Sequence, residues 1–340
     1  MKHLVKLARN FCLPLLLVLT SSGMSLAIEA SEAGETYMPF ILADNSSQSL
    51  ADATKSVTNK LKKAGFTIAG QYSPYNNTTI IIVTNDALKS AAGQSELGGF
   101  GAAQRVSLTQ IDGKVQISFT NPVYMSHVYR MKPDLTNIES QLSKALGNQK
   151  VYGPEEGLTK DDLRDYQYKW LMPYFSDRLE LAEYSDQQEA LAAVAKALAK
   201  NDGGVSKLYQ VDLKGKDETI IGVSMKGNSR SECSGDAYIM EQIDFKKIKS
   251  SGHLPYEMII KNGNVYALYA EFRIAINFPD LSMMGSNSFA SIMCAKIRRL
   301  KTTPSNPKTG VNNCSLLYSF SNHLPTRNNT QVHSEACYDS

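Results

Sequence analysis

The densest group of side chains that could do chemistry is the stretch SGHLPYE, where His253, Tyr256 and Glu257 stand directly before an expected strand. An imidazole and a carboxylate four residues apart could act as an acid and a base, or as two metal ligands. Pro255 argues against a strand that begins early enough to turn both side chains to one face. The alternative is a loop histidine and an edge-strand carboxylate. We therefore treat the three residues as a candidate ligand-binding cluster, and the catalytic residues stay unknown.

Two of the five cysteines, Cys233 and Cys294, could form a second site. They are either a disulfide, whose loop of about 60 residues would stabilise the fold by roughly 3–4 kcal/mol, or a reactive thiol and a buried thiol. A catalytic cysteine needs a positioned histidine, and His253 is the nearest candidate in the sequence. The cysteine spacing fits no metal-binding pattern, and no glycine-rich stretch has the spacing that cradles phosphates. We therefore expect no metal and no cofactor.

The first 27 residues have the order of a signal peptide: basic residues, the apolar run FCLPLLLVL, and small residues at Ser25 and Ala27. The apolar run is about half the ~20 residues needed to span a bilayer, which makes an uncleaved anchor the weaker alternative. No other segment is long and apolar enough to cross a membrane. The sequence thus predicts a protein that is periplasmic or secreted after cleavage before Ile28, with no membrane span.

The charge balance excludes one class of partner. Three of the 36 basic residues lie in the leader, which has no acidic residue, so the mature chain has as many basic residues as its 33 acidic ones. A nucleic-acid surface needs a basic stripe on a folded element. We therefore expect no nucleic-acid partner.

The first half of the mature chain predicts a helix, two strands, a hairpin and a closing helix. The stretch SLADATKSVTNKLKKAGF has apolar residues at helical spacing, with Ser49 and Asp52 as a capping box. The β-branched runs FTIAGQY and TTIIIVTN follow, and then two strands flank Asp112-Gly113, a strong hairpin signal. The closing helix, PDLTNIESQLSKALG, starts at Pro133 or Asp134.

The same order returns about 140 residues later. The stretch SDQQEALAAVAKALAKNDGG predicts a helix capped by Ser185 and Gln188, and the strand TIIGV repeats TIIIV. LPYEMII and NVYALYAEFRIAINF are expected as strands on either side of Asn262-Gly263. In this register His253, Tyr256 and Glu257 align with Ala103, Val106 and Ser107, so the polar cluster is particular to the second copy. The alternatives are an internal duplication, or two unrelated units that share common turns.

The second copy lacks a counterpart of the closing helix. In its place stands KIRRLKTTPSNPKTG, which has two prolines and no apolar face. We expect residues 295–340, rich in Asn, Ser and Thr, to form a disordered tail, and the second sheet to expose the apolar surface that the helix would have covered. A shifted reading frame or a replaced C-terminus would also leave an abrupt change at Ala295.

These patterns predict an α+β protein of two similar units in tandem, each with helices packed on a mixed or antiparallel sheet, the second without its C-terminal helix. The expected segments are a signal peptide (1–27), a first unit (36–150), an aromatic-rich connector (151–184), a second unit (185–294) and the tail (295–340). The connector holds the single tryptophan, Trp170, among tyrosines and a phenylalanine. These aromatics either pack the two units together or form a platform on which a sugar or another ligand stacks.

The features SLADATKSVTNKLKKAGF, TIIIV and IDGKVQISFTNP resemble the bacterial domain-of-unknown-function family 302. The stretch SGHLPYEMIIKNGNVYALYAEFRIAINFPDLSMMG resembles the second unit of exported tandem members of that family. The resemblance covers about Met38 to Cys294 and stops at the tail. It implies small α+β domains, helices over a mixed or antiparallel sheet, and often self-association. It implies no settled activity, so it assigns no catalytic residue.

Two hypotheses for function follow. The first is an exported, non-enzymatic module that binds a small ligand, an envelope component or another copy of itself. The second is a hydrolase- or redox-like enzyme centred on His253, Glu257 and possibly Cys233. The two differ in geometry, because an enzyme of this kind would bring these three side chains into one accessible pocket.

Overall fold

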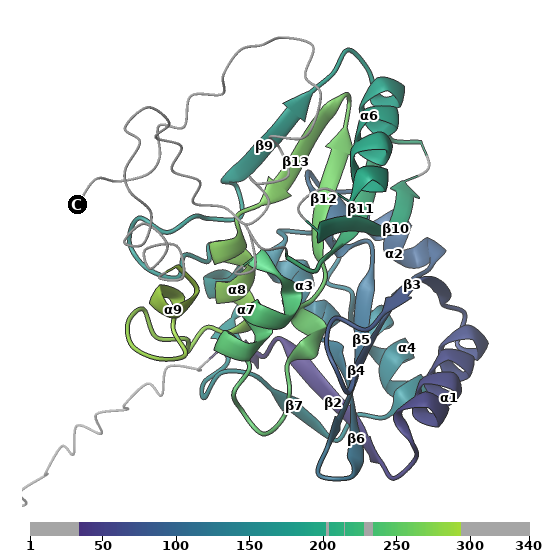
Figure 1. The fold of residues 1–340 in the computed structure, drawn as a ribbon, viewed down its shortest axis with the longest axis vertical. Helices are drawn as coiled ribbons and strands as arrows, with labels where there is room; N and C mark the ends of the chain where they lie inside the picture. The colour runs from purple at the N-terminus through teal and green to yellow at the C-terminus, as the bar shows by residue number, and fades with distance from the viewer. Residues whose placement is uncertain (1–33, 202–203, 214, 228–233, 294–340) are drawn as a thin grey trace, which may run out of the picture. The chain divides into compact units, whose positions relative to one another are not determined.

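The computed structural model describes residues 34–201, 204–213, 215–227 and 234–293 (Figure 1). Within these ranges the chain is α+β, with one sheet of six strands and one of five, and all pairings inside both sheets are antiparallel. The fold class expected from the sequence is thereby confirmed. The predicted signal peptide, Cys233, Cys294 and the predicted tail from 295 to 340 lie outside the described residues.

The first sheet has the strand order β3-β4-β5-β6-β2-β7. Its strands are β2 (Phe40–Ser46), β3 (Thr67–Tyr72), β4 (Thr78–Thr84), β5 (Gln104–Ile111), β6 (Lys114–Thr120) and β7 (Lys150–Tyr152). Strand β4, the apolar TIIIV run, is buried along its whole length. The turn at Asp112-Gly113 joins β5 to β6 with positive φ at both residues, which confirms the predicted hairpin.

Helices cover one face of this sheet (Figure 1). They are α1 (Leu50–Lys63) and α4 (Thr136–Leu146), and the remaining helices of this half are α2 (Asp86–Ala92), η1 (Gly98–Gly101) and α3 (Pro122–Val128). The predicted cap of α1 is present, because the Ser49 hydroxyl accepts the Asp52 N–H at 3.1 Å and donates to its carboxylate at 2.7 Å. Helix α4 begins after Leu135, slightly later than expected.

The second sheet has the order β10-β11-β12-β13-β9, with α6 packed against β10, β12 and β13 (Figure 1). Its strands are β9 (Arg178–Glu183), β10 (Val205–Leu213), β11 (Glu218–Met225), β12 (Tyr256–Lys261) and β13 (Asn264–Leu268). The helices of this half are α6 (Gln187–Lys200), α7 (Asp236–Ile243), η4 (Ser251–His253), α8 (Ala270–Asn277) and α9 (Phe289–Met293). The segment between the sheets adds α5 (Lys160–Arg164) and β8 (Leu158–Thr159), which pairs with β1 (Thr36–Tyr37).

The two halves have the same topology. In each sheet the chain makes a strand, a helix, two further strands and then a hairpin, and the first strand lies beside the second strand of that hairpin. Bulges interrupt corresponding strands, at Ala43 in β2 and Leu181 in β9, and at Ala69 in β3 and Leu208 in β10. Bulges are specific local features rather than random defects, so their recurrence adds to the likeness of the two sheets.

Three local expectations were wrong. The run NVYALYAEFRIAINF is not one strand, because β13 ends at Leu268 and α8 begins at Ala270. Most of this run is buried, and an apolar stretch without a polar face does not distinguish a strand from a helix. Helix α6 is capped by Asp186, which accepts the Glu189 N–H at 2.8 Å, and not by Ser185 with Gln188. Strand β9 lies inside the segment that the sequence assigned to the connector.

The apolar surface expected on the second sheet is absent from the described residues. Five large apolar side chains are exposed in these ranges, and none lies on β9 to β13: Val151, Trp170, Leu171, Phe245 and Met284. The exposed positions of β9 are polar instead, and the Arg178 guanidinium lies 4.8 Å from the centre of the Tyr266 ring. No helix within the described ranges is long and apolar enough to cross a membrane.

Loops and connector aromatics hold the two sheets against each other. The short helix η1, before β5, packs on β11 and β12, while η4, before β12, packs on β4, β5 and β6. The connector residue Phe175 lies 5.6 Å from Tyr129 of the first half and 6.1 Å from Phe272 of the second, ring centre to ring centre. The expected packing role is therefore confirmed for Phe175, whereas Trp170 is 83% exposed.

Candidate functional site

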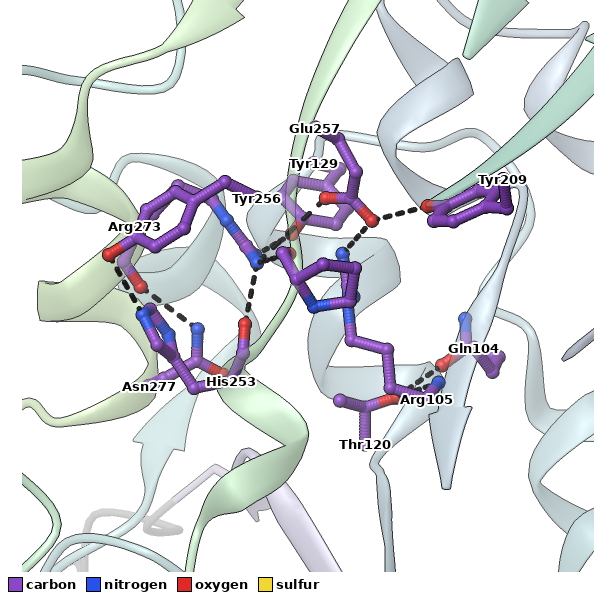
Figure 2. A network of polar contacts seen from close by, with 11 residues as sticks. Gln104, Arg105, Thr120, Tyr129, Tyr209, His253, Tyr256, Glu257, Arg273 and Asn277 are labelled. Atoms are coloured by element: carbon purple, nitrogen blue, oxygen red, sulfur yellow. Dashed lines mark hydrogen bonds and ion pairs between the residues drawn. The ribbon is translucent and has the colours of Figure 1, made fainter. Parts of the chain in front are cut away.

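The predicted cluster lies in a buried polar network where the two halves meet (Figure 2). At its centre is the Glu257 carboxylate on β12, which is 4% exposed. One carboxylate oxygen accepts hydrogen bonds from the guanidinium of Arg105 on β5 and from the Tyr209 hydroxyl, the latter at 2.7 Å. The other oxygen lies 3.8 Å from Nη2 of Arg273 on α8. A single carboxylate thus interacts with cations from both halves of the chain.

Strand β5 places Arg105 on the face of the first sheet that meets the second half. Alternation along the strand puts Arg105 and Thr109 on the same face, and the Thr109 hydroxyl lies 3.0 Å from the Ser251 hydroxyl of η4. Burial alone would lower the pKa of the Arg105 guanidinium, but the Glu257 carboxylate raises that pKa above its ordinary value. Arg105 therefore stays charged although only 1% of it is exposed.

Gly222 makes room for the Tyr209 ring. These two residues are cross-strand partners in β10 and β11, and a Cβ atom at position 222 would overlap the ring. The matching position of the first half is occupied by Ile82. Burial, and then the nearby Glu257 carboxylate, raise the pKa of Tyr209 well above its usual value, so its hydroxyl keeps the proton that it donates to Glu257.

His253 and Tyr256 form the second part of the network. The His253 Nε2 atom lies 3.0 Å from the Tyr256 hydroxyl. Burial, together with the charges of Arg273 and Arg105, lowers the pKa of His253 well below its usual value, so the imidazole is neutral at physiological pH. Arg273 joins this part to the first half of the chain, because Nη2 donates to the His253 carbonyl at 2.8 Å and Nη1 donates to the Tyr129 hydroxyl at 2.6 Å.

The three predicted residues thus lie in one network, and all three side chains are buried. His253, Tyr256 and Glu257 are each 4% exposed or less, and neither cleft described below includes them. Tyr256 and Glu257 are neighbours on β12, so their side chains point to opposite faces of the sheet. In this arrangement the network can fix the two halves in place.

An accessible cleft of about 190 Å³ lies beside the C-terminal end of α7. Six of its lining residues have apolar side chains, and one of these, Phe245, is 53% exposed: Pro154, Ile243, Phe245, Phe278, Pro279 and Leu281. Lys246 and Asp280 lie in the same lining and form an ion pair at 3.3 Å. Lys246 also donates to the Gly153 carbonyl at 2.8 Å, which ties the connector to the second half.

Two buried aspartates stand at the ends of α7, and one of them lines this cleft. Both carboxylate oxygens of Asp244 accept the Ser250 N–H, at 3.1 and 3.0 Å. Asp236, the first residue of the helix, accepts the Met225 N–H at 3.1 Å. Burial raises the pKa of each carboxyl to about 7. The carboxyls of Asp236 and Asp244 therefore gain or lose a proton near neutral pH.

Within the described ranges, no group of three or more histidine, cysteine, aspartate or glutamate side chains could hold a metal ion. Arg105 and Tyr209 were missed in the sequence, because they lie far from Glu257 along the chain, and Arg273 was missed because it lies in the run that was expected to be a strand. Arg105 is the one charged residue of β5, whereas α8 contains Glu271 as well as Arg273.

No family model matches the chain, and no curated protein matches it. One solved structure that aligns with it is described as the uncharacterized conserved protein DUF302 from Bacillus stearothermophilus. That alignment has a TM-score of 0.29 and 18% sequence identity, and it covers 31% of this chain and 93% of the other. The neighbour belongs to the family that the sequence motifs resemble, but at this TM-score the likeness says nothing about the site.

The buried ion pair yields a prediction for stability. Replacing Glu257 by Gln should lower the free energy of unfolding by about 3–5 kcal/mol, because it leaves two arginines buried without their carboxylate. Arg105→Met should cost a similar amount, and the double variant should cost at least about 1 kcal/mol less than the two single changes together. Urea unfolding of the three variants measures this coupling. Strictly additive costs would show that the two side chains do not interact.

The aspartates of α7 yield a prediction for pH dependence. Their pKa values are higher in the folded chain than in the unfolded one, so the folded state binds protons more tightly. Their stabilising contribution is complete below about pH 4 and is lost as the pH rises through 7, by on the order of 4 kcal/mol per group. His253 acts in the opposite direction, so the informative quantity is the difference between native and Asp244→Asn protein at each pH.

Urea unfolding across this pH range should show a smaller loss of stability for Asp244→Asn than for the native chain. Asp217→Asn is the matched control, because Asp217 is exposed and its side chain makes no hydrogen bond or ion pair with the described residues. Parallel pH profiles for native and Asp244→Asn protein would contradict the assignment.

Proposed function

We propose that the chain is an exported, non-enzymatic binding protein built from two copies of one α+β unit, and that it binds a small ligand in the cleft beside α7. The duplication is supported by the common strand order, the corresponding bulges and the two hairpin turns with positive φ. Export is supported by the order of basic, apolar and small residues in the first 27 positions.

The observation that carries the binding proposal is the composition of the cleft. It combines an apolar wall with a few polar groups that converge on it, which is the usual character of small-molecule sites. The connector, the end of α7 and the end of α8 all contribute to the lining. The cleft therefore lies between the connector and the second half, which the hydrogen bond from Lys246 to the Gly153 carbonyl ties together.

The lining also indicates the chemical class of the ligand. Its charged groups are the carboxyls of Glu155, Asp244 and Asp280, and the ammonium of Lys246. Lys246 already interacts with Asp280, so the surplus is acidic. We expect a small, largely apolar molecule that carries an N–H or O–H donor, and the Phe245 ring would cover its apolar part.

A hydrolase- or redox-like activity centred on His253 and Glu257 has less support. The imidazole and the carboxylate are buried and already interact with other side chains, and Cys233 lies outside the described residues. A general base must reach the proton of a bound substrate, and neither side chain is accessible to one.

The cleft can be tested with the fluorescent probe N-phenyl-1-naphthylamine, an apolar amine with one N–H. The probe should bind saturably, and Phe245→Ala should weaken its binding about fivefold, because covering the exposed half of the ring is worth about 1 kcal/mol. Met284→Ala, which removes another exposed apolar side chain outside the cleft, is the matched control. Equal affinity of native and Phe245→Ala protein would exclude the cleft as the binding site.

Export is tested by the N-terminus of the mature protein. Mass spectrometry of protein recovered from outside the cytoplasm should give Ile28 as its first residue. A chain that keeps Met1 and sediments with membranes would contradict both cleavage and release.

A further inference from the structure

A second hollow in the surface, a groove of about 1,110 Å³, lies next to the cleft. The segment Pro279–Leu281 lines both hollows and so separates them. The charged side chains in the lining of the groove are mostly acidic, with five carboxylates and one ammonium: Glu156, Asp161, Asp162, Asp165, Asp280 and Lys169. The groove therefore favours a positively charged occupant.

The described part of the chain ends beside this groove. Helix α9 is its last element, and the Phe289 ring lies 4.8 Å from the ring of Tyr168, centre to centre. Tyr168 lines the groove and donates its hydroxyl proton to the Leu281 carbonyl. From Phe289 to the end of α9 the chain advances by only about 6 Å. The residues that follow thus start within a short distance of the acidic lining.

The residues that follow have the complementary charge. The segment Lys296–Lys301, KIRRLK, contains four basic residues, and Ile297 and Leu300 lie between them. It begins three residues after Met293, and an extended chain covers about 10 Å in that length. The segment can therefore reach the groove of its own molecule without moving the folded part.

We propose that Lys296–Lys301 binds in the acidic groove of the same molecule. Its basic side chains contact the carboxylates of the lining, and its two aliphatic side chains contact exposed apolar residues in the segments that form the groove. Trp170 and Leu171 follow the lining residue Lys169, and Met284, which is 75% exposed, follows the lining residue Met283. The sequence of Lys296–Lys301 has no helical or strand pattern, so in this proposal the groove fixes where the segment lies.

Two of the five carboxylates are available for new ion pairs. Glu156 and Asp161 are exposed, and their side chains make no hydrogen bond or ion pair with the described residues. The other three already have partners, since Asp162 caps α5, Asp165 pairs with Arg130 and Asp280 pairs with Lys246. Neutralising Glu156 and Asp161 therefore removes charge from the groove without removing a contact of the fold.

The test is limited proteolysis of the full mature chain with trypsin. Cleavage after Arg299 is measured by mass spectrometry relative to cleavage after Arg327, which lies in the same terminal region outside the proposed segment. This ratio corrects for changes in the protease itself. Docking should make the ratio low at low ionic strength, and high salt should raise it, because exposed ion pairs are screened.

The groove variant Glu156→Gln/Asp161→Asn should raise the ratio about fivefold, because it removes two exposed ion pairs that hold the segment in the groove. The control is Asp217→Asn/Glu183→Gln, which removes the same charge from exposed positions outside the groove and should leave the ratio unchanged. The native ratio should also be independent of protein concentration, because the docking is intramolecular.

Equal ratios in the native chain and the groove variant would overturn the proposal. A ratio that falls as the protein concentration rises would also overturn it, because the groove would then bind the segment of a second copy. The cleft experiment with the naphthylamine probe does not involve Glu156, Asp161 or the terminal segment, so each proposal can fail without the other.

Discussion

The Glu257 carboxylate is the interaction on which the rest of the structure depends. It is the anion shared by Arg105 of the first sheet and Arg273 of the second half, and the three groups are almost completely buried. Burying charges costs several kcal/mol per ion unless their partners are well placed. The two halves must therefore meet in one arrangement, and Gly222, η4 and the start of α8 all serve that geometry.

The two halves have the same chain topology, but their charged residues differ. Loops before corresponding strands cross over in the same way, since η1 contacts the second sheet and η4 contacts the first. The chemistry is not symmetrical, because the register that aligns the two hairpins places Ser107 at the position of Glu257. Equivalent positions in the two halves thus form the same strands and loops, whereas the charged residues are not the same at aligned positions. This combination gives a pair of units a fixed orientation that two identical copies would not specify.

Local signals were sufficient for some elements but not for the site. The cap at Ser49 and the turns at Asp112-Gly113 and Asn262-Gly263 depend on adjacent residues, and all three were predicted correctly. Strands β2 and β9 were missed, since their neighbours in the sheet come from distant parts of the sequence. The same limit applies to the site. The cluster of His253, Tyr256 and Glu257 is local and was predicted, but Arg105 lies 152 residues from Glu257 and Tyr209 lies 48 residues from it. Only the folded arrangement relates them.

The bulged strands β3 and β10 have a consequence for solubility. Each is the outermost strand of its sheet, and a free edge offers backbone groups to which a strand of another molecule can add. The two edges meet at their bulges, where a Cβ atom on Gly70 would lie 3.2 Å from the Leu208 carbonyl oxygen. Neither edge continues the ladder of the other, and each covers part of its neighbour. The tandem arrangement therefore shields two aggregation-prone edges within one chain.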